Sequence, residues 1–128
     1  MVWYLDTSAL LKLITVEDES PAMRAWYASH SPIWSSQLLH TEALRAGVRL
    51  GIEIAIVEEA LDTVSMVLPS VTTFFAAGRL LPPELRSLDA LHLATAIEIG
   101  DDLEGLVAYD DRLIGAARAA SIEVITPS

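Results

Sequence analysis

The sequence contains no cysteine, so it forms no disulfide and offers no thiolate for catalysis or metal binding. It also lacks the basic segment and long apolar run of an N-terminal export signal, and no apolar stretch approaches the length of a membrane span. We therefore expect a soluble, cytoplasmic protein with no membrane anchor.

Aromatic residues are few, at 6% of the chain, whereas apolar residues of all kinds make up 52% and are mostly Leu, Ala, Ile and Val. This balance excludes disorder and is typical of helices packed on a buried sheet. The length of 128 residues is that of one domain. Residues 1–128 are therefore predicted to form a single domain with one core.

Basic residues are scarce, because eight Lys and Arg stand against eighteen Asp and Glu and give a formal net charge of −10. This charge argues against a protein that binds nucleic acid through a broad basic face. It also means that carboxylates brought together by the fold have few cations of the chain's own to neutralise them.

Strand and helix patterns alternate along the chain. Strands are predicted at 2–5, 32–36, 67–71, 103–109 and 122–125. Helices are predicted at 8–16, 21–29, 37–50, 53–65, 88–99 and 111–120, and a further one follows the third strand and ends near Gly78. Ser20 and Ser87 are predicted helix caps. The alternation predicts an α/β fold with a five-stranded parallel sheet and helices on both faces.

Four acids stand where such a sheet could gather them. Ligands of parallel sheets bind beyond the carboxyl ends of the strands, where the strand order reverses, and Asp6 and Asp110 each follow a predicted strand. Asp89 opens a helix that is apolar nearly all round, and Glu42 borders the apolar stripe of its own helix. Clustered carboxylates raise one another's pKa unless a cation intervenes, and oxygen ligands suit Mg²⁺ or Mn²⁺ rather than zinc.

Each acid also has a purely structural interpretation. Asp6, Asp89 and Asp110 all suit the first turn or the cap of a helix, where a carboxylate meets free N–H groups and the positive end of the helix dipole. Glu42 stands three residues before Arg45, which is the spacing of an exposed ion pair.

Three further residues, two of them close to the acids in the sequence, have open or minor roles. His92, one turn after Asp89, either lines the site or is a buried histidine with satisfied ring nitrogens. Thr7 is interpreted as a helix cap, and His30 as a solvated loop residue.

Four segments together resemble the PIN domain, and specifically the VapC-type toxin ribonucleases of bacterial toxin–antitoxin pairs: YLDTSALLKL, HTEALRA, LRSLDALHLATA and VAYDDRLIGAAR. The likeness covers essentially the whole chain. It implies that Asp6, Glu42, Asp89 and Asp110 form a catalytic acidic quartet, in which the three aspartates hold Mg²⁺ or Mn²⁺. Glu42 would complete the metal shell or orient the attacking water.

Ser8 matches a hydroxyl that the family often places beside the first aspartate, and it would hold the Asp6 carboxylate or a bound water. Asp111 departs from the one-acid pattern of the family and could share or contest the role of Asp110. Apart from the resemblance, the candidate RNA contacts are Lys12, Arg45 and Arg112, for which ordinary surface charge is the alternative.

The resemblance implies a metal-dependent endoribonuclease that cleaves RNA with metal-activated water, forms a homodimer and is inhibited by a cognate VapB-type antitoxin. Two alternatives remain, namely a housekeeping RNA-processing PIN nuclease and a non-catalytic PIN-like binding module. A phospho-acceptor receiver domain is disfavoured, because it needs a lysine after its last strand and the chain's single lysine is Lys12.

Overall fold

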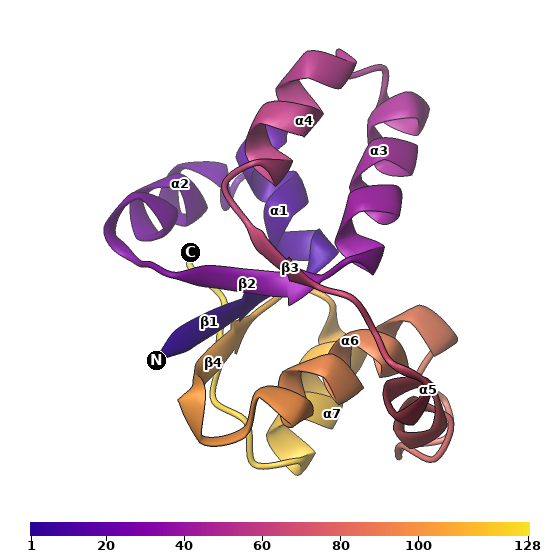
Figure 1. The fold of residues 1–128 in the computed structure, drawn as a ribbon. Coiled ribbons are helices and arrows are strands. Elements are labelled where there is room, and N and C mark those ends of the chain that lie inside the picture. The colour runs from indigo at the N-terminus through magenta and orange to yellow at the C-terminus, as the bar shows by residue number, and fades with distance from the viewer.

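Five parallel strands form one sheet in a computed structural model that describes all residues 1–128 (Figure 1). The strands are β1 (Val2–Leu5), β2 (Ile33–Ser36), β3 (Ser65–Val67), β4 (Leu103–Val107) and β5 (Val124–Ile125). The helices are α1 (Thr7–Ile14), α2 (Ser20–Ser29), α3 (Leu38–Leu50), α4 (Ile54–Leu61), α5 (Val71–Ala77), α6 (Ser87–Ile99) and α7 (Asp111–Ala119), with a 3₁₀ turn at Gly100–Asp102. The predicted fold class is confirmed.

The strand order β3-β2-β1-β4-β5 reverses next to β1. The chain first adds β2 and β3 on one side of β1, then returns to place β4 and β5 on the other side. In the register of the central pairs, Tyr4 lies opposite Trp34 of β2 and Leu106 of β4. The switch point therefore lies at the carboxyl ends of β1 and β4, where a ligand site is expected.

Alternate residues of the central strands supply two cores on opposite faces of the sheet. Leu5 and Val107 pack with α1 to α4 on one face, whereas Tyr4 and Leu106 pack with α6 and α7 on the other (Figure 1). Each such fully buried side chain contributes about 1.5–3 kcal/mol relative to exposure. Burial on both faces is the reason that these strands read as continuous apolar runs.

The third strand begins and ends earlier than predicted, at Ser65–Val67 rather than 67–71. Ser70 is not in the strand, because its hydroxyl accepts the N–H of Thr73 and its own N–H donates to the Thr73 hydroxyl. This capping box starts α5 and ends the extended segment.

Two predicted caps are wrong by one residue. Ser20 and Ser87 are the first residues of α2 and α6, and Glu19 and Arg86 occupy the cap positions without a capping side chain. Ser20 instead closes the preceding turn, since its hydroxyl donates to the carbonyl of Thr15 and accepts the N–H of Glu17. None of the helices is long and apolar enough to cross a membrane.

Candidate active site

Asp6 lies at the carboxyl end of the central strand β1 and caps α1. Its N–H donates to the carbonyl of Val107 at 3.0 Å, which joins the ends of β1 and β4. Its Oδ2 accepts the N–H of Ser8 at 3.1 Å and the hydroxyl of Ser8 at 2.6 Å. The residue is only 4% exposed, so its carboxylate is held in place and largely out of bulk water.

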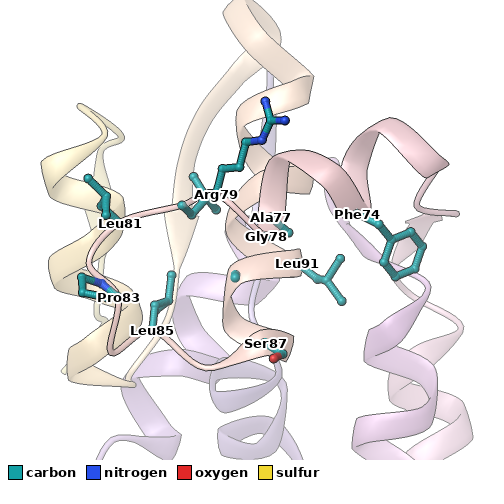
Figure 2. A pocket seen from close by; sticks show the side chains of 11 residues that line it. Phe74, Ala77, Gly78, Arg79, Leu81, Pro83, Leu85, Ser87 and Leu91 are labelled. Carbon is teal, nitrogen blue, oxygen red and sulfur yellow. The ribbon is translucent and has the colours of Figure 1, made fainter.

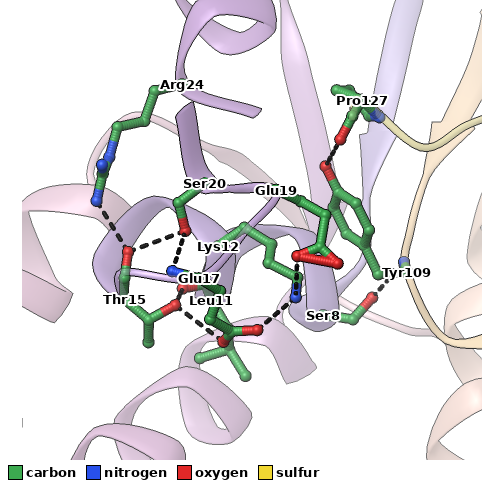
Figure 3. Close-up of polar contacts among 10 residues, drawn as sticks. All are labelled: Ser8, Leu11, Lys12, Thr15, Glu17, Glu19, Ser20, Arg24, Tyr109 and Pro127. Atoms are coloured by element: carbon green, nitrogen blue, oxygen red, sulfur yellow. Dashed lines mark hydrogen bonds and ion pairs between the residues drawn. The ribbon is translucent and has the colours of Figure 1, made fainter. Parts of the chain in front are cut away.

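Ser8 connects Asp6 to the segment that follows β4. Its hydroxyl donates to Asp6. The same hydroxyl accepts the N–H of Tyr109 at 2.9 Å (Figure 3). The Tyr109 hydroxyl in turn donates to the carbonyl of Pro127 at 2.6 Å, which fastens the C-terminal residues. The geometry therefore includes the contact to Asp6 that the sequence predicts for Ser8.

Asp110 stands at the start of α7, where its Oδ1 accepts the N–H groups of Arg112 and Leu113 at 2.9 and 3.2 Å. Asp111 is exposed and lines a different hollow, together with Arg118 and the C-terminal residues. The two adjacent aspartates thus face different surroundings.

Asp89 lies in the first turn of α6 and makes no side-chain hydrogen bond. Burial raises the pKa of Asp89 to about 6, and the negative charges of Asp110, Asp6 and Glu42 add to this effect, while His92 opposes it. Since Asp110, Asp6 and Glu42 all act on the pKa of Asp89, the fold brings the four predicted acids near one another.

Glu42 enters the cluster from α3 with one carboxylate oxygen already engaged. Its Oε1 accepts the Thr7 hydroxyl at 3.0 Å and lies 2.5 Å from Nε2 of His92. The alternative interpretation, an exposed ion pair with Arg45, is wrong, because Arg45 forms no ion pair. The interpretation of Thr7 as a cap is also wrong, since Asp6 caps α1 and Thr7 binds Glu42.

His92 is fully buried and hydrogen-bonded at both ring nitrogens, which confirms the interpretation as a satisfied histidine. Burial lowers its pKa, but the hydrogen bond to Glu42 and the nearby acids outweigh this and leave the pKa above its ordinary value. The contact with Glu42 was missed at the sequence level. The available signal was the one-turn spacing from Asp89, which places both side chains on one helix face.

His30 differs from its prediction as a solvated residue. Its ring stacks on Trp26 with centroids 4.3 Å apart, and it packs edge-on against Trp3 at 5.7 Å. This histidine therefore belongs to the packing between α2 and β1.

The donor chemistry of the acidic cluster fits a hard divalent cation. Asp6, Glu42 and Asp110 each engage one carboxylate oxygen in protein hydrogen bonds and leave the second oxygen free of them. As the side chains lie, no three His, Cys, Asp or Glu residues form a group placed to hold a metal ion. The donors are oxygens, and no basic residue forms an ion pair with any of the four acids apart from His92.

Of the three predicted RNA contacts, Lys12 is already engaged. Its ammonium pairs with Glu17 at 2.5 Å and Glu19 at 3.2 Å, and it lies 5.2 Å from the ring centroid of Tyr109 (Figure 3). Its side chain is 13% exposed. Arg45 and Arg112 are exposed and form no ion pair, so their guanidinium groups, unlike the ammonium of Lys12, are not engaged by acids of the chain.

A separate hollow of about 540 Å³ lies between α5, the segment after it and α6. Figure 2 shows Phe74, Leu81 and Leu91 around it, and none of the four acids lines it. Its lining is mainly apolar, so the hollow is not part of the acidic site.

The sequence matches the model of the PIN domain over residues 3–119. It is 41% identical over 126 residues to Ribonuclease VapC46 of Mycobacterium tuberculosis, covering 98% of this chain and 97% of that protein. It is also 39% identical over 134 residues to Ribonuclease VapC35 of the same species, covering 97% of this chain and 96% of that protein.

Two solved structures share the fold. They are Mycobacterium tuberculosis VapC20, a Sarcin-Ricin loop cleaving toxin (TM-score 0.78, 18% identity, 98% of this chain and 99% of that chain), and a toxin–antitoxin complex from Klebsiella pneumoniae (TM-score 0.72, 21% identity, 98% and 97%). The solved structures, at 18% and 21% identity, show the fold alone, whereas the full-length identities of 41% and 39% to the two ribonucleases show the family. The chain is a PIN-domain protein and belongs to the family of VapC ribonucleases.

Proposed function

We propose that this chain is a metal-dependent endoribonuclease and the toxin of a toxin–antitoxin pair, with its active site at the carboxyl ends of β1 and β4. The observation that supports this most is the cluster itself. Asp6, Glu42 and Asp110 all act on the pKa of Asp89 near the switch point of the sheet. A structural role would not need four such groups in one place, because like charges destabilise the fold.

Asp6, Asp89 and Asp110 would hold Mg²⁺ or Mn²⁺. The ion, when bound, lowers the pKa of water and neutralises charge on phosphoryl oxygens. Ser8 and the first turn of α1 keep the Asp6 carboxylate in place through Oδ2. Since Oε1 of Glu42 is held by Thr7 and His92, its Oε2 would orient the attacking water and accept its proton.

The test is cleavage of a total-RNA mixture and of defined single-stranded and hairpin RNAs by the purified chain. We expect cleavage with Mg²⁺ or Mn²⁺, none in EDTA, and none for Asp6→Asn. Full cleavage in EDTA would refute the metal dependence, and cleavage by the Asp6 variant would show that a contaminating nuclease was measured.

The net charge of −10 suggests the chemistry of the antitoxin. A basic segment of that partner would be attracted to the acidic edge, and an arginine could occupy the cluster in place of the divalent ion. Guanidinium pairs with carboxylate through two parallel hydrogen bonds, which makes it a suitable substitute. A short neighbouring gene for a DNA-binding protein would support this role, and its absence would favour a housekeeping RNA-processing nuclease.

The homodimer remains a proposal, for which the apolar surface beside the hollow of Figure 2 is the candidate interface. Phe74 and Leu81 line the hollow and are 51% and 73% exposed, and Phe75 of α5 is 69% exposed. Analytical ultracentrifugation should give a dimer for the wild-type chain and a monomer for Phe75→Glu. A monomeric wild-type chain at micromolar concentration would refute the dimer.

A further inference from the structure

His92 is a buried residue that contacts the acidic site from the core. It is 0% exposed and lies on α6, one turn after Asp89. Its Nδ1 is 2.7 Å from the hydroxyl of Tyr4, and its Nε2 is 2.5 Å from Oε1 of Glu42. Burying an imidazole is costly unless its nitrogens find partners, and here both do. The ring therefore connects a core tyrosine of β1 to a site acid of α3.

The direction of the hydrogen bond to Glu42 follows from chemistry. An ionised carboxylate only accepts, so the proton lies on Nε2 of His92. In the neutral ring Nδ1 then accepts the hydroxyl proton of Tyr4, and in the charged ring Nδ1 donates to the oxygen of Tyr4. Nε2–H points to Glu42 in both states, so the contact does not depend on the charge of the ring.

Two donors from different elements meet at the same oxygen of Glu42. The Thr7 hydroxyl donates to Oε1 at 3.0 Å, alongside His92. Thr7 directly follows Asp6, and His92 follows Asp89 by one turn, so each donor is rigidly linked to another acid of the site. A glutamate side chain has three rotatable torsions, and fixing one of its oxygens leaves the other in a defined place.

We propose that His92 is a positioning residue for Glu42. Supported by Tyr4, it holds Oε1 of Glu42 so that Oε2 keeps its place relative to Asp6 and Asp89. This inference rests on the proposed function, in which Glu42 orients the attacking water. His92 itself does not touch the reacting atoms.

The first experiment compares His92→Leu with His92→Gln in RNA cleavage. Leucine fills the space without a donor, whereas the glutamine amide can still donate to Glu42. We expect His92→Leu to lower kcat about 10- to 100-fold, with KM changed less than about threefold, and His92→Gln to recover most of the loss. In a Glu42→Ala background, His92→Leu should have no further effect, because a positioning residue acts only through its target.

The matched control is Leu93→Ala, the next residue of α6, which is also fully buried but faces the core under Leu106. It should lose stability and keep kcat at a temperature where it is folded. If His92→Leu keeps the wild-type kcat, or lowers it equally with and without Glu42, the inference is overturned.

The second experiment needs no activity. The chain has three histidines, and ¹H–¹⁵N spectra of ¹⁵N-histidine protein should show the Nε2–H of His92 protected from solvent exchange. This signal should vanish in His92→Leu and shift or broaden in Glu42→Ala. A spectrum without it, or one unchanged by Glu42→Ala, would overturn the contact. A wild-type chain that cleaves no RNA would instead refute the nuclease, while the spectrum still decides whether His92 holds Glu42.

Discussion

Replacing Asp89 by asparagine should stabilise the metal-free protein while it abolishes cleavage. The carboxyl of Asp89 is half-buried, lies among other acids and makes no hydrogen bond, so its ionised form is unfavourable in the fold. Asparagine has nearly the same shape and carries no charge. The stabilisation should appear in EDTA, because a bound divalent ion would neutralise the cluster.

The magnitude follows from the pKa of Asp89. A rise from 3.8 to about 6 corresponds to about 3 kcal/mol of unfavourable free energy once both the folded and unfolded states are ionised. Partial exposure and salt screening reduce this to about 2 kcal/mol. The loss of a negative charge from the first turn of α6 costs about 0.3–1 kcal/mol. We therefore expect a net gain of about 1 kcal/mol in unfolding free energy, or about 3–5 °C in Tm.

The stabilisation by Asp89→Asn should increase with pH. Because the folded-state pKa of Asp89 is raised, the loss of unfolding free energy that its ionised carboxylate causes is complete above about pH 6. This loss is absent below pH 3.8, where the carboxyl is protonated in both the folded and the unfolded state. The gain from Asp89→Asn should therefore be largest at pH 7.5 and fall to about half at pH 5. Urea denaturation in EDTA at the two pH values measures it.

Asp111→Asn is the matched control, since Asp111 also lies in the first turn of a helix but is exposed. It should be neutral or slightly destabilising at both pH values. Added Mg²⁺ should stabilise the wild-type chain more than Asp89→Asn. A variant of Asp89 that is less stable than wild type at pH 7.5, or whose gain does not depend on pH, would refute the reasoning and favour a purely capping role.

Three further predictions concern the site and its partners. Ser8→Ala removes a hydroxyl that bridges Asp6 and the N–H of Tyr109, so it should lower the unfolding free energy by about 1–2 kcal/mol and cleavage about tenfold; unchanged urea denaturation and cleavage would contradict this. Arg112→Gln should weaken binding of a non-cleavable RNA in a filter assay, whereas Lys12→Met should have a smaller effect because its ammonium is already paired; the reverse order would show that the ion pairs of Lys12 open to RNA. Inhibition by the neighbouring gene product should weaken as salt is raised from 50 to 500 mM, because charges are screened over about 8 Å at physiological ionic strength and over shorter distances at higher salt. Mutation of the arginine of that partner should also weaken inhibition, and salt-independent binding would exclude electrostatic recognition.

The fold class could be predicted from the sequence because its signals are local. Short apolar runs such as VWYL and LEGLV are too brief for helices, and they alternate with amphipathic segments such as the one from Leu38 to Leu50. The four acids could be selected for the same reason, since each stands at an element boundary or beside an apolar stripe. Boundaries were less certain, as at β3, because the capping box of Ser70 and Thr73 competes with extended structure.

Only the tertiary structure decided which groups meet at the site. The contact of Glu42 with His92 spans 50 residues, and that of Ser8 with Tyr109 spans 101. No local pattern encodes such pairs, because they depend on the strand order that places β4 beside β1 and on the packing of α3 against the sheet. The same packing half-buries Asp89 and raises its pKa. The sequence by itself thus determined which acids were predicted to gather at the edge of the sheet. The three-dimensional arrangement determined their partners and the raised pKa of Asp89, because hydrogen bonding and desolvation depend on distance in space and not on separation along the chain.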